Sequence, residues 1–140
     1  MSDELQRFIK AQEQDYAIAL AEIQSGRKRG HWMWYIFPQL AGLGSSPTSK
    51  FYAIADMNEA NAYLLHEQLG QRLIEITTAL LGLSTNDANE VFGSPDNMKL
   101  RSSMTLFSLI PNAPPVFQAV LDKFFSGNHD DRTKKLLIGQ

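Results

Sequence analysis

The sequence contains no cysteine, which excludes disulfide bonds, thiolate metal sites and a cysteine nucleophile. It also has no apolar run that approaches the roughly 18 residues of a membrane-spanning helix. The first residues, Met1 to Glu4, are acidic, unlike the basic and then apolar order of a secretory signal peptide. We therefore expect a cytoplasmic protein without a membrane segment.

The net charge is also small, and several standard functional motifs are absent. Thirteen Lys and Arg against fifteen Asp and Glu leave a formal charge of −2, so the composition gives no strong signal for nucleic acid. The histidines are far apart, and no His-x-x-x-His pair, Walker loop or nucleophile elbow occurs. We expect no metal and no cofactor. Any binding of anions must come from a local group of cations.

Apolar residues instead recur at steps of three and four along most of the chain, a pattern typical of helices. Helices are predicted over residues 5–23, 56–64, 69–81, 84–93, 94–109, 115–125 and 130–137. Residues 41–49, rich in Gly, Ser and Pro, are predicted to form the main loop. The only extended candidate is the short segment 51–54. The chain is thus predicted to be all-α, with residues 1–140 forming a single domain with short connections.

Cap residues support several of these boundaries. Asp56 and Glu59 have the spacing of a capping box. Ser94 before Pro95 predicts a helix with a serine cap and proline at its first position. Either Asp130 or Asp131 is expected to cap the last helix.

The most informative segment, residues 26–40, joins a basic turn to an aromatic stretch. It begins with Gly26-Arg27-Lys28-Arg29-Gly30-His31 and continues with both tryptophans of the chain, Trp32 and Trp34. Arginine can bind phosphate or carboxylate through two hydrogen bonds, and flanking glycines let backbone N–H groups approach an oxyanion. An indole could stack on a base or a sugar. The alternative is a solvated basic turn at a helix end, with the aromatic side chains in the core.

The conformation of the aromatic stretch is ambiguous from sequence. A helix would place His31, Trp34 and Tyr35 on one face. A strand would instead align Trp32, Trp34 and Ile36.

A second candidate lies on the helix predicted over residues 94–109. Helical spacing places Lys99, Ser102 and Ser103 on one face, and Arg101 and Thr105 on the neighbouring face. Hydroxyls buried without partners are costly, so the hydroxyls of Ser102, Ser103 and Thr105 are expected to face water or a polar cavity. A serine nucleophile beside Lys99 is one interpretation. A hydrogen-bonded packing role is favoured because no base is adjacent.

A third candidate, Asp122, could act as a general base or orient Arg101. It could equally form a structural ion pair, which is the favoured interpretation.

Several blocks of the chain resemble the bacterial family catalogued as domain of unknown function 1810. These blocks are residues 26–40, 42–46, 52–54, 92–107 and 121–125. The resemblance spans nearly the whole chain, and the first and fourth blocks are long enough to be specific. The resemblance implies a multihelical fold with a buried central helix pair, and it implies no activity.

Charged and hydroxyl residues within these blocks are harder to explain by packing than apolar ones. We predict that the blocks meet across a cleft that binds a small phosphorylated or nucleotide-like anion. One version is a glycosidase or hydrolase acting on a substrate of the ADP-ribose type. The predicted ligand-binding residues are Arg27, Arg29, Trp32, Trp34, Lys99, Arg101, Ser102 and Ser103, and the predicted catalytic residues are His31 and Asp122. The alternative is a non-catalytic module that binds protein or RNA through residues 26–40.

Overall fold

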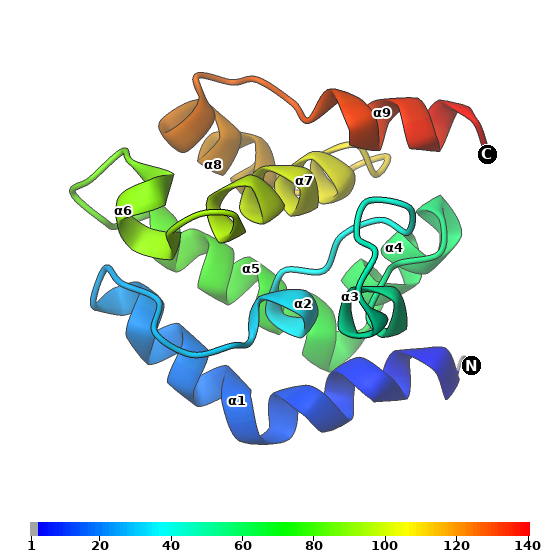
Figure 1. Ribbon diagram of the computed structural model, residues 1–140, viewed down its shortest axis with the longest axis horizontal. Helices are drawn as coiled ribbons and strands as arrows, with labels where there is room; N and C mark the ends of the chain where they lie inside the picture. Colours follow the sequence, from blue (N-terminus) through cyan, green and yellow to red (C-terminus); the bar gives the residue numbers. More distant parts are fainter. Residues whose placement is uncertain (1–2) are drawn as a thin grey trace.

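The computed structural model describes residues 3–140, and this part of the chain is all-α (Figure 1). Its elements are η1 (Asp3–Leu5), α1 (Gln6–Gln24), α2 (Met33–Ile36), α3 (Pro47–Phe51), α4 (Met57–Leu65), α5 (Glu67–Leu81), α6 (Ala88–Phe92), α7 (Asp96–Ser108), α8 (Val116–Phe125) and α9 (Asp131–Ile138). No β-strand occurs in residues 3–140; a single parallel bridge joins Leu40 to Ile54. The predicted fold class is confirmed. In the same residues, no helix has both the length and the apolar character required to cross a membrane.

Two helices, α5 and α7, occupy the centre of the fold. In Figure 1 they lie between α1 on one side and α8 and α9 on the other. Helix α5 contacts α1, α4 and α8, and α7 contacts α4, α6, α8 and α9. Every residue from Ser102 to Phe107 of α7 is buried. Because α7 is central, its polar residues Ser102, Ser103 and Thr105 are buried as well.

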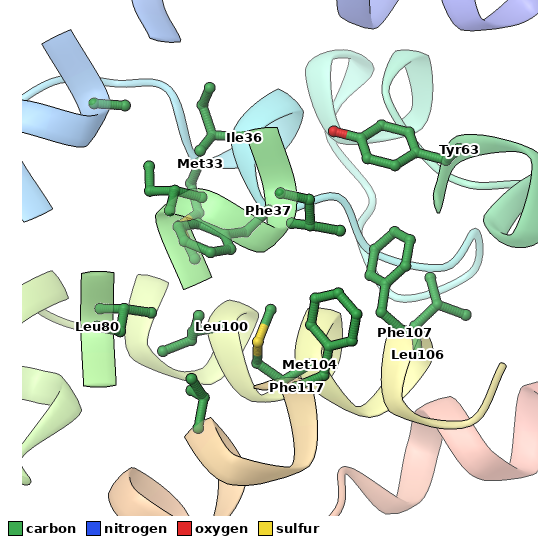
Figure 2. Close-up of a cluster of buried hydrophobic side chains, with 14 of the residues drawn as sticks. Met33, Ile36, Phe37, Tyr63, Leu80, Leu100, Met104, Leu106, Phe107 and Phe117 are labelled. Atoms are coloured by element: carbon green, nitrogen blue, oxygen red, sulfur yellow. The ribbon is translucent and has the colours of Figure 1, made fainter. Parts of the chain in front are cut away.

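Aromatic side chains connect these helices through the core (Figure 2). The ring centroids of Tyr63 and Phe107 lie 5.5 Å apart, and those of Phe107 and Phe117 lie 5.7 Å apart. All three side chains are fully buried. Burial of one such side chain contributes about 1.5–3 kcal/mol. This cluster joins α4, α7 and α8 into one core.

The helix caps follow the sequence prediction at two boundaries. An Asp56 carboxylate oxygen accepts a hydrogen bond from the backbone N–H of Glu59 at 2.9 Å. Asp130, one of the two predicted candidates, caps α9 by accepting from the N–H of Thr133 at 3.0 Å. Short polar side chains are effective caps because they satisfy N–H groups that have no partner within the helix.

Several predicted boundaries are wrong, among them the start of the helix predicted over residues 84–93, which begins at Ala88. Ser94 does not cap α7; Pro95 occupies the capping position, and its carbonyl accepts from the N–H of Met98 at 3.0 Å. The loop predicted over residues 41–49 ends early because α3 begins at Pro47. There the Ser46 hydroxyl accepts from the N–H of Ser49 at 3.1 Å, and proline stands at the first helical position.

The aromatic stretch after the basic turn is helical, as one of its two interpretations predicted. Trp34 and Tyr35 lie within α2, and both border one hollow together with His31. Trp32 precedes the helix and is buried in the core. The structure therefore separates the environments of the two tryptophans.

Candidate functional site

A hollow of about 540 Å³ lies where α2, the loop before α3, and the beginnings of α7 and α9 come together. We call it the polar hollow. Three predicted site residues line it, namely Trp34, Lys99 and Ser102. The sequence blocks 26–40 and 92–107 thus meet at one cavity, as the site prediction requires.

Lys99 provides a cation at the wall of the polar hollow. Its ammonium nitrogen lies 5.1 Å from the centroid of the Trp34 ring and 3.3 Å from Asp96 Oδ1. The other oxygen of Asp96 lies 2.8 Å from the ammonium of Lys28. One carboxylate is therefore shared by two lysines, which leaves the group with excess positive charge. A cation over an indole face is a favourable electrostatic contact.

Hydroxyl groups line the same hollow from two directions. Ser46 Oγ and Ser49 Oγ lie 2.9 Å apart in the first turn of α3. Ser102 Oγ lies 3.2 Å from the carbonyl oxygen of Met98 and 3.3 Å from Asp130 Oδ2. These groups can both donate and accept hydrogen bonds, so they suit a ligand rich in oxygen atoms.

Asp130 is the carboxylate that borders the polar hollow. Its Oδ2 accepts from the N–H and the hydroxyl of Thr133, at 3.0 and 2.6 Å, as well as contacting Ser102. Within residues 3–140 no group of three or more His, Asp or Glu side chains is arranged to hold a metal ion.

The basic turn does present converging N–H donors, but they bind the chain's own carboxylate. Glu22 Oε1 accepts from the backbone N–H of Arg29 at 2.7 Å and of Gly30 at 2.9 Å, and from the indole N–H of Trp32 at 2.9 Å. Burial alone would raise the pKa of Glu22. These three hydrogen bonds, together with the charge of Lys28, outweigh burial and lower the pKa below its ordinary value. The N–H groups of this turn therefore bind the Glu22 carboxylate in place of the ligand oxyanion that the sequence predicted.

The remaining predicted residues of the first block do not line the polar hollow. The side chains of Arg27 and Arg29 are exposed to solvent. Trp32 is 2% exposed and belongs to the core, which was the alternative interpretation. His31 is exposed and borders a second hollow, which it shares with Trp34 and Tyr35.

Arg101 and Asp122 also lie elsewhere. The Arg101 guanidinium donates to the carbonyl oxygens of Asn128 at 3.1 Å and His129 at 2.7 Å, so it fixes the connection between α8 and α9. Asp122 is exposed and accepts from the side-chain amide of Gln118 at 3.0 Å. The structure therefore does not place Asp122 against Arg101.

Ser102, Ser103 and Thr105 are all buried, and the expectation that their hydroxyls face water or a cavity holds for Ser102 only. Thr105 Oγ1 donates to the carbonyl of Arg101 and accepts from the N–H of Asp130, each at 2.8 Å. Ser103 Oγ has no hydrogen-bond partner among residues 3–140. The expectation is wrong for Thr105 because the helix backbone itself supplies an acceptor.

Replacing Arg101 by alanine is expected to reduce stability by about 2 kcal/mol, because two hydrogen bonds from a charged group are lost. Urea denaturation measures the loss. The affinity for a phosphorylated ligand is expected to stay within twofold of the wild-type value. Reduced affinity with unchanged stability would instead place Arg101 in the binding site.

Sequence reasoning missed several residues of the polar hollow. They are Gln39, Ser45, Ser46, Ser49, Asp130 and Arg132. The serines had a signal, since hydroxyls recur in the loop after Gly44. Arg132 had none, because only the packing of α9 against the rest of the fold brings it to this cavity.

These features define a multihelical, all-α protein with a hydroxyl-lined hollow that holds one tryptophan face and one lysine. The chain belongs to the family described as "Protein of unknown function (DUF1810)", whose model matches residues 2–137. It is similar to the crystal structure of the conserved hypothetical protein Rv1873 from Mycobacterium tuberculosis. The two are 47% identical, the similarity covers 96% of each chain, and the TM-score is 0.94. No curated protein matches the chain.

Proposed function

We propose that this protein binds a small phosphorylated or nucleotide-like ligand in the polar hollow. The observation that carries the proposal is the convergence of the Lys99 ammonium, the Trp34 ring and the Ser102 hydroxyl on one cavity. A volume of about 540 Å³ lies within the range of small-molecule sites.

Each group supplies one part of the recognition. The ammonium of Lys99 attracts an anion, and it can turn from Asp96 toward the ligand because Lys28 still pairs with that carboxylate. The serine hydroxyls donate to ligand oxygens, and the indole offers a flat apolar surface. Arg132 stands at the same cavity and adds a second cation.

The positions of the candidate catalytic residues limit the proposal to binding. Neither His31 nor Asp122 borders the polar hollow, so a hydrolytic step there would take its base from Asp130. The hydrogen bonds that cap α9 already engage Asp130 Oδ2. Binding is thus supported by more contacts than catalysis is.

The alternative of an interaction module receives less support. It needs a flat, exposed aromatic and basic surface over residues 26–40. Instead Trp32 and Phe37 are in the core, and Glu22 holds the basic turn.

Replacing Lys99 by methionine is expected to weaken the binding of phosphorylated ligands about tenfold, because the charge is lost while the chain length is kept. Inorganic phosphate, ribose 5-phosphate, AMP and ADP-ribose are the probes for a thermal-shift screen, followed by titration calorimetry. A ligand at about 100 times its Kd adds about 2.7 kcal/mol of stability, which raises Tm by several degrees.

The control variant is Lys10→Met, which removes an exposed lysine of α1 outside the hollow. It is expected to bind like the wild type. Equal weakening by Lys10→Met and Lys99→Met would reject the polar hollow as the binding site. No shift with any of the four probes would reject the proposed function.

A further inference from the structure

A second hollow, of about 590 Å³, shares Trp34 with the polar hollow and is lined mainly by aromatic rings. We call it the aromatic hollow. Tyr35, Phe51 and Tyr52 form its aromatic wall, and Pro47 adds an apolar face. Trp34 borders both hollows. The segment around α3 also borders both, with Ser46 and Ser49 at the polar hollow and Pro47, Thr48 and Phe51 at the aromatic hollow.

The two hollows that share Trp34 differ in chemistry. Lys99 lies over the ring and borders the polar hollow, but it does not border the aromatic hollow. Within residues 3–140 no other aromatic ring packs against Trp34. Trp34 therefore has a cation near its ring, borders the aromatic hollow, and has no aromatic stacking partner in the part of the chain that the structure describes.

Contacts between its rings and one hydrogen bond hold the aromatic wall in place. The Tyr35 and Tyr52 centroids lie 5.1 Å apart, and the Phe51 ring meets Tyr52 edge-on at 4.8 Å. The Tyr35 hydroxyl donates to the carboxylate of Asp15. Phe51 nevertheless remains 59% exposed. A fixed aromatic wall with an exposed ring is a surface on which a planar group can stack without rearranging the protein.

We infer that the ligand is a nucleotide whose phosphate lies near Lys99 and whose base stacks in the aromatic hollow against Trp34 and Phe51. This inference rests on the proposed function and adds the ligand class, since a sugar phosphate or inorganic phosphate would use the polar hollow alone. Stacking of a base on an aromatic side chain changes affinity by roughly 5- to 150-fold. All bases have a flat face, so purine and pyrimidine nucleotides are both expected to gain affinity from stacking.

The test compares AMP and UMP with ribose 5-phosphate by titration calorimetry on the full chain. Both nucleotides are expected to bind at least fivefold more tightly than ribose 5-phosphate. Phe51→Leu keeps an apolar side chain but removes the ring, and it is expected to abolish most of this advantage. Phe51→Tyr restores a ring and is expected to restore the advantage. Affinity for ribose 5-phosphate is expected to be the same in all three proteins.

A spectroscopic measurement locates the base independently. Stacking on Trp34 is expected to quench tryptophan fluorescence when AMP is added, whereas ribose 5-phosphate leaves it unchanged. In Trp34→Phe only the buried Trp32 emits, and the quenching is expected to disappear.

Three results would overturn the inference. Equal affinity for the nucleotides and for ribose 5-phosphate, with both weakened by Lys99→Met, rejects the base site and leaves the proposed function standing. A nucleotide advantage that persists in Phe51→Leu, with quenching that persists in Trp34→Phe, places the base elsewhere. Absence of binding by all three probes rejects the inference and the proposed function together.

Discussion

Replacing Glu22 by alanine is expected to lower the free energy of unfolding by about 3 kcal/mol at neutral pH. The substitution removes the acceptor of three N–H groups, from Arg29, Gly30 and the indole of Trp32. Trp32 is 2% exposed, so water does not readily replace the carboxylate at its side chain. The space beside the turn is also narrow, since a Cβ at Gly30 would lie 2.8 Å from Trp32 Cδ1. Urea denaturation followed by circular dichroism measures the loss.

Glu22→Gln is the matched control, because its amide oxygen can still accept these hydrogen bonds without the charge. A smaller loss of about 1 kcal/mol is expected. If Glu22→Gln destabilises as much as Glu22→Ala, the charge rather than the acceptor geometry is what holds the turn.

The contribution of Glu22 is expected to depend on pH in a defined direction. Its pKa in the folded protein is lowered from the ordinary value of 4.5. A depressed carboxyl pKa stabilises the fold above the unfolded pKa, and this stabilisation is lost as the pH falls through the folded pKa. The stability difference between wild type and Glu22→Gln should therefore be constant near neutral pH and shrink below about pH 4.5. A difference that does not change with pH would contradict the assignment of Glu22 as a charged acceptor.

Gly70→Ala is the second substitution with a large expected effect, a loss of about 3 kcal/mol. Gly70 lies in the first turns of α5 and is buried. A Cβ at this position would meet the carbonyl oxygen of Leu64 at 2.0 Å and its carbonyl carbon at 2.9 Å. Because these atoms belong to the backbone of α4, relief of the clash requires that α4 and α5 move apart. The expected decrease in Tm is roughly 10 °C.

Gly82→Ala is the control for this experiment. Gly82 is exposed at the end of α5, with an ordinary φ of −81°, and its nearest Cβ contact is the oxygen of Ala79 at 3.5 Å. Alanine is accommodated there, so a change between zero and about 1 kcal/mol of added stability is expected. Similar Tm values for Gly70→Ala and wild type would show that the α4–α5 junction opens readily.

The polar hollow illustrates how far the site was predictable. Trp34, Lys99 and Ser102 were identified because aromatic, cationic and hydroxyl side chains stand within blocks typical of a family. Arg27 and Arg29 were chosen by the same reasoning, yet the turn that carries them directs its N–H groups to Glu22. Charge and residue type are visible in a sequence, whereas the partner of each charge is not.

By itself the sequence determined the all-α class, most of the helices, the cap at Asp56 and the family, and it left Asp130 and Asp131 as alternative caps of the last helix. These are local properties, since apolar periodicity and capping depend on residues within a few positions of one another. Only the tertiary structure decided that Lys28 pairs with Asp96, that Arg101 fixes the α8–α9 connection, and that Trp34 borders two hollows. The reason is physical: these contacts join residues far apart in the chain, and they form only where the packing of whole helices brings their ends together.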